Sequence, residues 1–368
     1  MTIAFLGDPA SIHLRRWAGH FADRGHHVVL LLPDGQTVPP DLAGGISIER
    51  FAPHTTHGGF TFGMLATRRS MRSVIARVRP DILHVHYLTV HGIRAWLSGF
   101  HPYVVTVWGD DVLITVGQSR RARLFAWLSL RSADLVTGIS RHVVDAAIRV
   151  GAKPDRVRVI HFGVDIDRFS PGPDPAALRE RLGLAGRRVL FSPRTIARLY
   201  RHDTVIDSLS RLPDDVSLVM TRHLADPAEL EAVERRIAEK GLASRVVIVP
   251  SVPHSDMADF YRLADVVVSV PESDAGPVTL VEALATGRSC VSSDLPPVRA
   301  WLADLDPVCL VPIGDATATA RAIGDVLARG AAERARLAEL GRTAVIERAD
   351  YRRTMAEMEA LYRALADR

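Results

Sequence analysis

The chain is poor in the residues that would place it in several large classes of protein. Its 368 residues include two cysteines, Cys290 and Cys309, and both lie inside apolar segments. Neither a disulfide framework nor a cysteine zinc site is therefore available, and we expect two buried thiols in a reducing compartment. No apolar run reaches the roughly 18 residues of a membrane span, and the first residues, TIAFLG, read as a strand rather than a secretory signal. The expected location is the cytoplasm.

Lysine is almost absent, and acidic residues are missing from one long segment. Residues 1–170 hold 20 Lys and Arg against 13 Asp and Glu, whereas the rest of the chain holds 26 against 29. No acidic residue lies between Arg50 and Arg79, and this stretch carries Arg68, Arg69, Arg72, Arg77 and Arg79. Such a basic amphipathic helix either meets an anionic membrane or phosphorylated substrates, or is only a solvated face. Aromatic residues do not interleave the arginines in a stacking pattern, so nucleic acid is not an expected partner.

Short apolar runs alternate with helical patterns along the whole chain. They lie at residues 2–7, 26–32, 81–86, 103–108 and 134–140, and after residues 157–165 the series restarts at 187–193, 216–221, 245–250, 265–271, 288–294 and 308–312. Strands that are apolar throughout and alternate with helices indicate parallel sheets covered on both faces. The length favours two domains, with proline-rich residues 165–178 as the linker. We expect an α/β fold of two doubly wound, Rossmann-like domains, with the ligand in a cleft between them.

The segment PESDAGPVTLVEALATG (271–287) places two acids in apolar surroundings. A helix is expected from Pro277 to a stop at Gly287. Thr279, Glu282 and Thr286 would form one polar stripe, which is either the solvated face of a packed helix or part of a site. Free N–H groups at the start of the helix would make an anion site, and they belong to Val278, Thr279 and Leu280.

Three arginines follow the expected strand at residues 187–193. Arg194, Arg198 and Arg201 lie just past it, and arginine suits bidentate contact with phosphate oxygens. Together with a helix N-terminus and a carboxylate that can accept two sugar hydroxyls, they suit a nucleoside diphosphate sugar. Each of these elements alone is common in proteins.

In this order, the segments resemble the retaining glycosyltransferases of family four, which have the GT-B fold. The sequence SDAGPVTLVEALATGRSCVSSD (273–294) looks like the acid-x7-acid signature of the family, with Asp274 where Glu is usual. Residues 189–209 resemble its phosphate-binding segment, residues 224–271 the run before the signature, residues 140–171 the domain crossover, and VVTVWGDDV (104–112) a loop of the N-terminal domain. The resemblance covers nearly the whole chain.

The resemblance implies a division of labour between two domains. Residues 1–168, completed by a helix at 349–368 that crosses back, would form the acceptor-side domain, and residues 169–348 the donor domain. Glu282 would hold the ribose hydroxyls, and Asp274, with the backbone of Ala275 and Gly276, hydroxyls of the transferred sugar. Arg194 with Arg198 or Arg201 would neutralise the diphosphate, so no metal or other cofactor is expected. Val252 would lie by the nucleobase.

On the acceptor side, the candidates are Ser11, His13, Trp108, Gly109, Asp110 and Asp111. Two consecutive carboxylates rarely chelate one ion, so Asp111 is interpreted as an acceptor-side, catalytic or structural residue. His13 is either a catalytic or acceptor-site residue or a histidine of the helix-capping region, and Trp108 either core or a sugar platform.

The sequence also departs from the family pattern. The first loop, GDPASIHLRRW, has no Gly-Gly pair, Trp108 stands where many members have His, His161-Phe162 replaces Pro-Asn, and Tyr200 replaces Lys.

The expected function is transfer of a sugar, with retention, from a UDP-sugar first or GDP-mannose second. The acceptor would be a glycan, a lipid-linked molecule or a small molecule, with or without peripheral membrane contact. Two alternatives stay open: a nucleotide-sugar 2-epimerase on the same fold, and an inactive partner subunit of another transferase.

Overall fold

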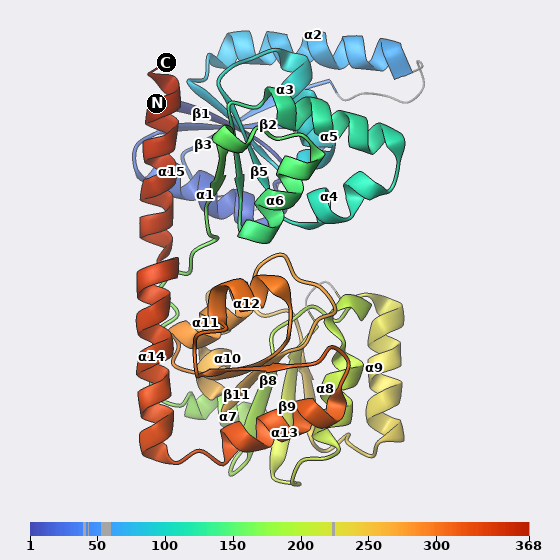
Figure 1. Cartoon of the computed structure of the whole chain (residues 1–368), viewed down its shortest axis with the longest axis vertical. Helices are drawn as coiled ribbons and strands as arrows, with labels where there is room; N and C mark the ends of the chain where they lie inside the picture. The colour runs from blue at the N-terminus through green and yellow to red at the C-terminus, as the bar shows by residue number, and fades with distance from the viewer. Residues whose placement is uncertain (40–41, 43, 53–59, 223–224, 368) are drawn as a thin grey trace. The chain divides into compact units, whose positions relative to one another are not determined.

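The computed structural model describes residues 1–39, 42, 44–52, 60–222 and 225–367. It divides into two compact units: unit 1 is Met1–His161 with Thr354–Arg368, and unit 2 is Phe162–Arg353. Each unit contains one parallel sheet, of seven strands in unit 1 and six in unit 2 (Figure 1). The expected α/β fold of two doubly wound units is therefore confirmed. No helix in the described part of the chain is both long and apolar enough to span a bilayer.

The sheet of unit 1 has the order β3 (Ile46–Phe51), β2 (His27–Pro33), β1 (Thr2–Leu6), β4 (Ile82–His86), β5 (Tyr103–Val107), β6 (Leu135–Gly138) and β7 (Val157–Val159). Its helices are α1 (Ile12–Asp23), α2 (Phe60–Val78), α3 (Ile93–Ser98), α4 (Asp110–Leu113), α5 (Arg120–Ser132) and α6 (Arg141–Val150), with short helices η2 (Leu88–Gly92), η3 (Thr115–Gly117) and η4 (Pro154–Arg156). The strand order reverses between β1 and β4, and the carboxyl ends of strands at such a reversal are the usual position of a ligand in a doubly wound sheet.

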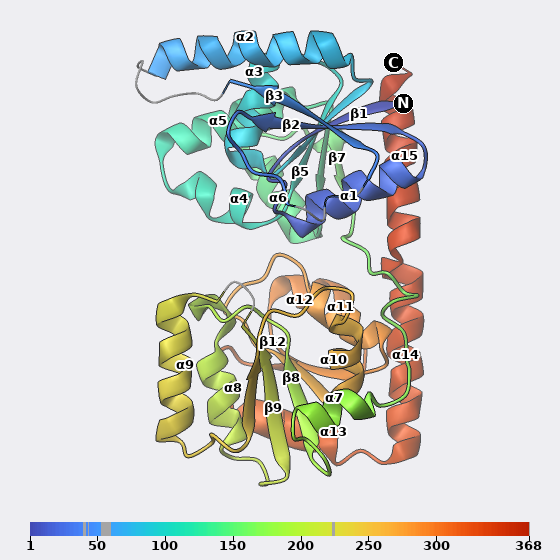
Figure 2. The same ribbon diagram turned by 180° about the vertical axis from the view of Figure 1, so that it is seen from behind.

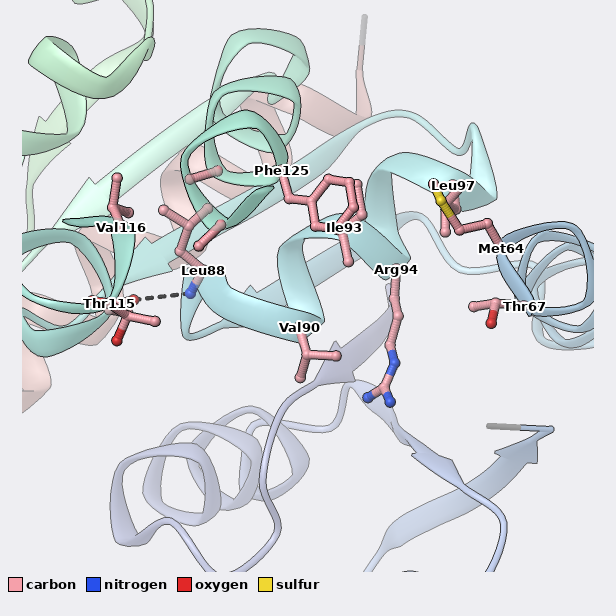
Figure 3. Close-up of a pocket in the computed structure, with 13 residues that line it drawn as sticks. Met64, Thr67, Leu88, Val90, Ile93, Arg94, Leu97, Thr115, Val116 and Phe125 are labelled. Carbon is pink, nitrogen blue, oxygen red and sulfur yellow. Dashed lines mark hydrogen bonds between the residues drawn. The ribbon is translucent and has the colours of Figure 1, made fainter. Parts of the chain in front are cut away.

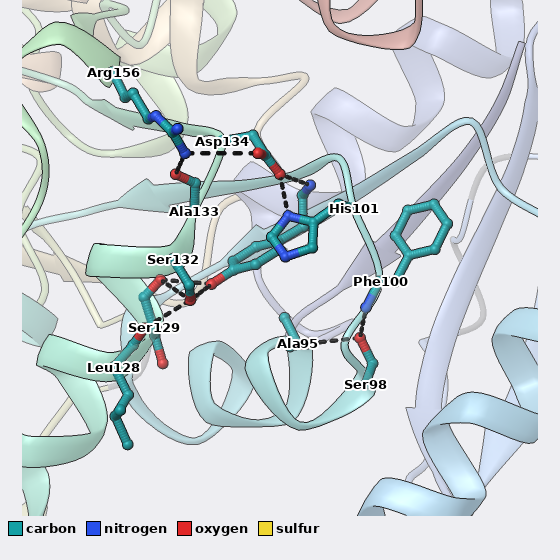
Figure 4. Close-up of polar contacts among 11 residues, drawn as sticks. Ala95, Ser98, Phe100, His101, Leu128, Ser129, Ser132, Ala133, Asp134 and Arg156 are labelled. Atoms are coloured by element: carbon teal, nitrogen blue, oxygen red, sulfur yellow. Dashed lines mark hydrogen bonds and ion pairs between the residues drawn. The ribbon is translucent and has the colours of Figure 1, made fainter. Parts of the chain in front are cut away.

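A cluster of polar contacts lies at the amino ends of three strands of this sheet. Asp134, just before β6, accepts hydrogen bonds from His101 Nδ1 (2.6 Å) and from the backbone N–H of Tyr103 (2.9 Å), and it pairs with Arg156 (3.7 Å). Figure 4 shows Asp134 between His101 and Arg156, and the three residues come just before β5, β6 and β7 in the sequence. These contacts connect the segments that precede the three strands.

The C-terminal helix α15 (Tyr351–Ala366) packs on unit 1 from residue Thr354 onward. Met355, Met358 and Tyr362 are fully buried. The Tyr362 hydroxyl is hydrogen-bonded to His84 Nδ1 at the centre of the sheet, and His84 Nε2 lies 2.7 Å from Thr106 Oγ1. The expected helix that returns to the N-terminal domain is confirmed.

The sheet of unit 2 has the order β10 (Val246–Val249), β9 (Val216–Thr221), β8 (Arg188–Ser192), β11 (Val266–Ser269), β12 (Ser289–Ser293) and β13 (Val308–Val311). Its helices are α7 (Ala176–Arg181), α8 (His202–Leu209), α9 (Pro227–Glu239), α10 (Met257–Leu263), α11 (Val278–Ala285), α12 (Pro296–Leu302), α13 (Ala316–Leu327) and α14 (Ala331–Ala349), with the short helix η5 (Arg198–Tyr200). One core joins the sheet to α7, α10, α11, α12 and α14, and a second joins it to α8, α9 and α13 (Figure 2).

The expected linker at 165–178 packs onto unit 2 instead of bridging freely. Phe169 is 1% exposed and belongs to the first of the two cores. The Arg342 guanidinium of α14 donates to the carbonyls of Phe169 and Ile166, each at 3.1 Å. Of the two thiols, Cys290 is buried as expected, whereas Cys309 is partly exposed, so that expectation is wrong for Cys309.

Candidate functional site

The topology of unit 2 brings two of the predicted charged residues together. Arg194 follows β8 and Asp274 follows β11, and the strand order reverses between these two neighbouring strands. The carboxyl ends of strands at such a reversal form the usual ligand crevice of a doubly wound sheet. Arg194 Nη1 lies 3.2 Å from Asp274 Oδ2, and each side chain is 12% exposed. The pair is nearly buried.

Tyr200 stacks on this ion pair. The Arg194 guanidinium lies 4.1 Å from the centre of the Tyr200 ring, within the range of a cation–π contact. Burial by itself lowers the pKa of Arg194, but Asp274 and the Tyr200 hydroxyl raise it, and the net direction is upward. Tyr200, which stands where the resemblance expected Lys, therefore supports a fixed cation instead of supplying one.

Glu282 projects from α11 into a buried polar cluster. The Tyr261 hydroxyl of α10 donates to Glu282 Oε2 at 2.7 Å, and His254 Nε2 lies 3.5 Å from Oε1. The Glu282 side chain is 9% exposed, and Thr286 is 2% exposed. The interpretation of this stripe as a solvated face is therefore wrong. Burial, followed by the Glu282 charge, holds the pKa of Tyr261 well above its ordinary value, so its proton is retained for the donated bond.

The tautomer of His254 follows from its other contact. Arg168 Nη1 lies 3.1 Å from His254 Nδ1, and because a guanidinium can only donate, Nδ1 accepts. The proton is then on Nε2, the atom that faces Glu282. Glu282 thus accepts one hydrogen bond at Oε2, and the Nε2 proton of His254 faces Oε1 at 3.5 Å.

Helix α11 ends as the sequence predicts but begins differently. Gly287 has φ +77°, and the amides of Gly287 and Arg288 donate to the carbonyls of Leu284 and Ala283, which is a Schellman cap. At the start, Pro277 is the N-cap, not the first helical residue, and the amides of Val278 and Leu280 donate to the carbonyls of Gly276 and Pro277.

The expectation of free amides is therefore wrong for Val278 and Leu280. The side-chain hydroxyl of Thr279, a different group from these backbone amides, is buried without a hydrogen-bond partner among the described residues.

The three arginines after β8 are not equivalent. Arg201 binds Asp203 through two contacts of 2.9 Å and Glu272 through one of 2.8 Å, so two carboxylates already neutralise it. Arg198, in η5, is exposed.

The Gly276 amide lies 3.4 Å from Asp274 Oδ1, in the half-buried loop that also holds Ala275. Val252, after β10, is half-buried against the first core of unit 2.

In unit 1, Asp111 has a structural role. Its Oδ1 accepts from the amides of Trp108 (3.1 Å) and Gly109 (2.9 Å), and its Oδ2 accepts from the amide of Leu88 (2.9 Å). The residue is 2% exposed, and burial raises its pKa although the backbone amides lower it. Of the roles considered for Asp111, the structure favours the structural one over the catalytic one, because the carboxylate ties the loop after β5 to the segment after β4. Asp110 is exposed.

His13 and Trp108 form a stack at the carboxyl ends of β1 and β5. Their ring centres lie 4.4 Å apart with the planes 9° from parallel. Trp108 is 5% exposed, so it belongs to the core, in agreement with one of its two interpretations. His13 lies in the first turn of α1 and Ser11 is its N-cap, so His13 lies in the capping region and also at the functional edge of the sheet.

The arginines of the basic segment are exposed, on α2 and, for Arg79, just after it. Arg72 Nε donates to the Ser98 carbonyl at 3.2 Å, and Arg77 pairs with Glu49 at 2.9 Å. Arg68, Arg69 and Arg79 are exposed as well. Residues 53–59 of the acid-free run lie outside the described residues.

The sequence did not predict the side chains that contact Glu282. Tyr261 and His254 were not identified, and nothing in their local sequence marks them as partners of Glu282. At the functional edge of unit 1, His86 is fully buried at the end of β4, with neither ring nitrogen hydrogen-bonded to any described residue. The next residue, Tyr87, has φ +69°, a backbone conformation that is strained for a residue with a side chain.

Known structures share the architecture over its full length. Sucrose-phosphate synthase from Thermosynechococcus elongatus superposes with a TM-score of 0.83 at 21% identity, covering 99% of both chains. HepE from Anabaena, in complex with UDP and glucose, gives a TM-score of 0.81 at 20% identity over 99% of this chain and all of that one. The fold and the site together define a glycosyltransferase of the GT-B class.

The sequence comparisons name the family. A model of Glycosyl transferase 4-like domains matches residues 2–140, and one of Glycosyl transferases group 1 matches residues 176–344. A D-inositol 3-phosphate glycosyltransferase from Xylanimonas cellulosilytica is 29% identical over 291 residues, which are 72% of this chain and 67% of that protein. The chain belongs to the glycosyltransferase family that these two models describe, as the sequence resemblance indicated.

Proposed function

We propose that the chain transfers a sugar, with retention of configuration, from a nucleoside diphosphate sugar to an acceptor bound by unit 1. One observation carries the proposal: a nearly buried Arg194–Asp274 pair and the buried carboxylate of Glu282 belong to segments that follow the carboxyl ends of β8 and β11. A UDP-sugar is the first choice of donor and GDP-mannose the second. The complex of the structural neighbour HepE with UDP and glucose supports that order.

The leaving group is stabilised by arginines in this proposal. As the bond between sugar and phosphate breaks, negative charge develops on the diphosphate, and a fixed cation lowers the energy of that state. Arg194 is held for this task by Asp274 and Tyr200. Arg198 is the better second cation, because Arg201 is already neutralised by two carboxylates. The two arginines supply the charge that a metal would otherwise supply.

The two acids hold opposite ends of the donor. Glu282 accepts the ribose hydroxyls with the lone pairs that Tyr261 and His254 leave open. An ionised carboxylate has about four acceptor positions, so Asp274 can keep its contacts with Arg194 and the Gly276 amide and still accept sugar hydroxyls. The acceptor hydroxyl then attacks on the face that the diphosphate leaves, and the departing phosphate oxygen takes its proton.

A direct test is a thermal-shift panel of nucleotides and nucleotide sugars. A ligand that binds the native state must raise the melting temperature, and we expect UDP and UDP-sugars to give the largest shifts. No shift with either UDP or GDP would refute the proposal and favour an inactive partner subunit. Interconversion of free UDP-sugars without any acceptor would instead identify a 2-epimerase.

Peripheral membrane contact through the arginines of α2 is a second part of the proposal. Co-sedimentation with vesicles that contain anionic lipid should weaken as salt rises, because exposed charges are screened within about 8 Å at physiological ionic strength. The double variant Arg68→Gln with Arg69→Gln should bind such vesicles less than the wild type. Equal binding to neutral and anionic vesicles would contradict this part.

A further inference from the structure

Unit 1 contains an apolar cavity that the proposed chemistry does not use. It lies beyond the carboxyl ends of β4 and β5, between α2, η2, α3, η3 and α5, and its volume is about 290 Å³ (Figure 3). Its apolar lining is Met64, Leu88, Val90, Ile93, Leu97, Val116, Ala122, Phe125 and Ala126. Figure 3 shows Leu88, Ile93 and Phe125 grouped on one side of it. The loop held by Asp111 forms part of the wall, so the cavity adjoins the predicted acceptor side.

The size and lining suit a hydrocarbon chain better than water or a sugar. The volume accommodates roughly ten water-sized groups, and a methylene group has a similar size. Water in a cavity needs two to four polar partners, and the polar residues of the lining are limited to Thr67, Arg94, Asp111 and Thr115. Of the lining residues, Val90 is 48% exposed, although its side chain is apolar. An exposed apolar side chain at the mouth of an apolar cavity is consistent with an interaction site.

Two polar groups of the lining have neither a hydrogen bond nor an ion pair with any described residue. The Thr67 hydroxyl is buried without a hydrogen bond to any described residue, and Thr67 is 3% exposed. Arg94 extends along one side of the cavity with its guanidinium 5.2 Å from the centre of the Phe51 ring (Figure 3). No residue in the described part of the chain forms an ion pair with Arg94, and burial lowers its pKa. A half-buried cation and a free hydroxyl beside an apolar cavity suit an anionic group.

The helices on either side of the cavity are positively charged. Next to the lining residues of α2 lie the exposed Arg68 and Arg69, and around Ala122 of α5 lie the exposed Arg120, Arg121 and Arg123. Exposed arginines on the helices that contribute to an apolar cavity complement a molecule with a hydrocarbon chain and a negatively charged head. Such a molecule is an anionic lipid.

We propose that this cavity binds the hydrocarbon chain of an anionic lipid, with the phosphate of its head group at Arg94 and Thr67. The inference rests on the proposed function in one respect: it identifies the acceptor of the sugar as a lipid-linked molecule. Binding itself does not depend on catalysis and can be measured without a donor.

The experiment is titration calorimetry of the full chain with decyl phosphate below its micelle concentration. Decanol and inorganic phosphate serve as the two half-ligands. We expect decyl phosphate to bind at least tenfold more tightly than either. Ala122→Phe, which fills the cavity from α5, should weaken decyl phosphate at least tenfold. Leu124→Phe is the matched control, because Leu124 is 53% exposed and not part of the lining, and it should leave binding unchanged.

A second pair of variants tests the charge. Arg94→Gln should weaken decyl phosphate but not decanol, whereas Arg181→Gln, at an exposed arginine of α7 in unit 2, should change neither. Equal affinity for decanol and decyl phosphate would refute the proposed binding of an anionic head group. Unchanged binding by a folded Ala122→Phe variant would refute the proposed binding of the hydrocarbon chain in the cavity.

UDP is titrated into the same samples so that the two proposals can fail separately. If the chain binds UDP but not decyl phosphate, only the lipid-binding proposal is rejected. The reverse result rejects the proposed donor function and leaves the lipid site in place.

Discussion

Glu282→Ala should weaken nucleotide binding far more than it changes the chemistry of transfer. The carboxylate is buried and accepts from Tyr261 at 2.7 Å. If it also accepts the ribose hydroxyls, its removal loses charge-assisted hydrogen bonds worth about 1.5–3 kcal/mol. That loss corresponds to a roughly ten- to hundredfold weaker Kd for UDP. Bare UDP is the right ligand, because it carries the ribose and the diphosphate but no transferred sugar.

The same substitution also destabilises the fold, and this effect must be separated from binding. Glu282→Ala leaves the buried Tyr261 hydroxyl without its acceptor, which costs about 1–3 kcal/mol. Tyr261→Phe is the matched control, because it removes the same hydrogen bond and keeps the carboxylate. We expect Tyr261→Phe to lower stability by about 0.5–1.5 kcal/mol and to leave the Kd for UDP within about threefold of the wild type.

The assay is calorimetric titration of UDP into wild type, Glu282→Ala, Glu282→Gln and Tyr261→Phe, with urea unfolding of each. Glu282→Gln keeps an acceptor for Tyr261, so it should recover stability while binding UDP more weakly than the wild type. If Glu282→Ala and Tyr261→Phe weaken UDP equally, the carboxylate acts only through packing and the ribose assignment is refuted.

Three further predictions concern other parts of the chain. Asp274→Asn should leave the Kd for UDP within about threefold but lower kcat sharply, because the sugar is no longer oriented for attack; an unchanged kcat would contradict its role. Truncation after Arg348 removes α15 and should lower the melting temperature by exposing the apolar face of unit 1 that α15 covers; unchanged melting would count against this. Arg363, then His26 and Arg24, lower the pKa of Glu359 to about 2, so the stability advantage of the wild type over Glu359→Gln should vanish as the pH falls from about 4.5 to about 2 in urea titrations.

Most of the sheet structure could be predicted because its strands are buried on both faces. Apolar runs such as residues 103–108 and 265–271 form central strands that helices cover. Because both faces of these strands are buried, nearly all their residues are apolar, and this composition can be recognised in the sequence. The exception is β3, which the sequence analysis did not identify. It is an edge strand, and Ser47, Ile48 and Arg50 on it are exposed or half-exposed, so it lacks an apolar run.

The sequence predicted the residues of the candidate site that local motifs mark, but not the residues that contact them. Arg194, Asp274 and Glu282 were found because they stand at fixed distances from strand and helix ends. Tyr261 could not be found, because its contact with Glu282 depends on how α10 packs against α11. The neutralisation of Arg201 depends likewise on Glu272, which is 71 residues away along the chain. Contacts of this kind are decided by tertiary packing, which no local pattern reports.

The buried histidines of unit 1 bear on the pH dependence of the proposed lipid binding. Burial lowers the pKa of His84 to about 3, that of His91 to about 4, and that of His86 well below its ordinary value. These rings are therefore neutral near pH 7, and the positive charge of the cavity region comes from arginines, which stay charged at any physiological pH. Binding of decyl phosphate should accordingly vary little between pH 6.5 and 8.5 once the ionisation of the phosphate itself is taken into account. A steep loss of affinity across that range, beyond what the ligand explains, would place a titrating histidine at the head group in place of Arg94.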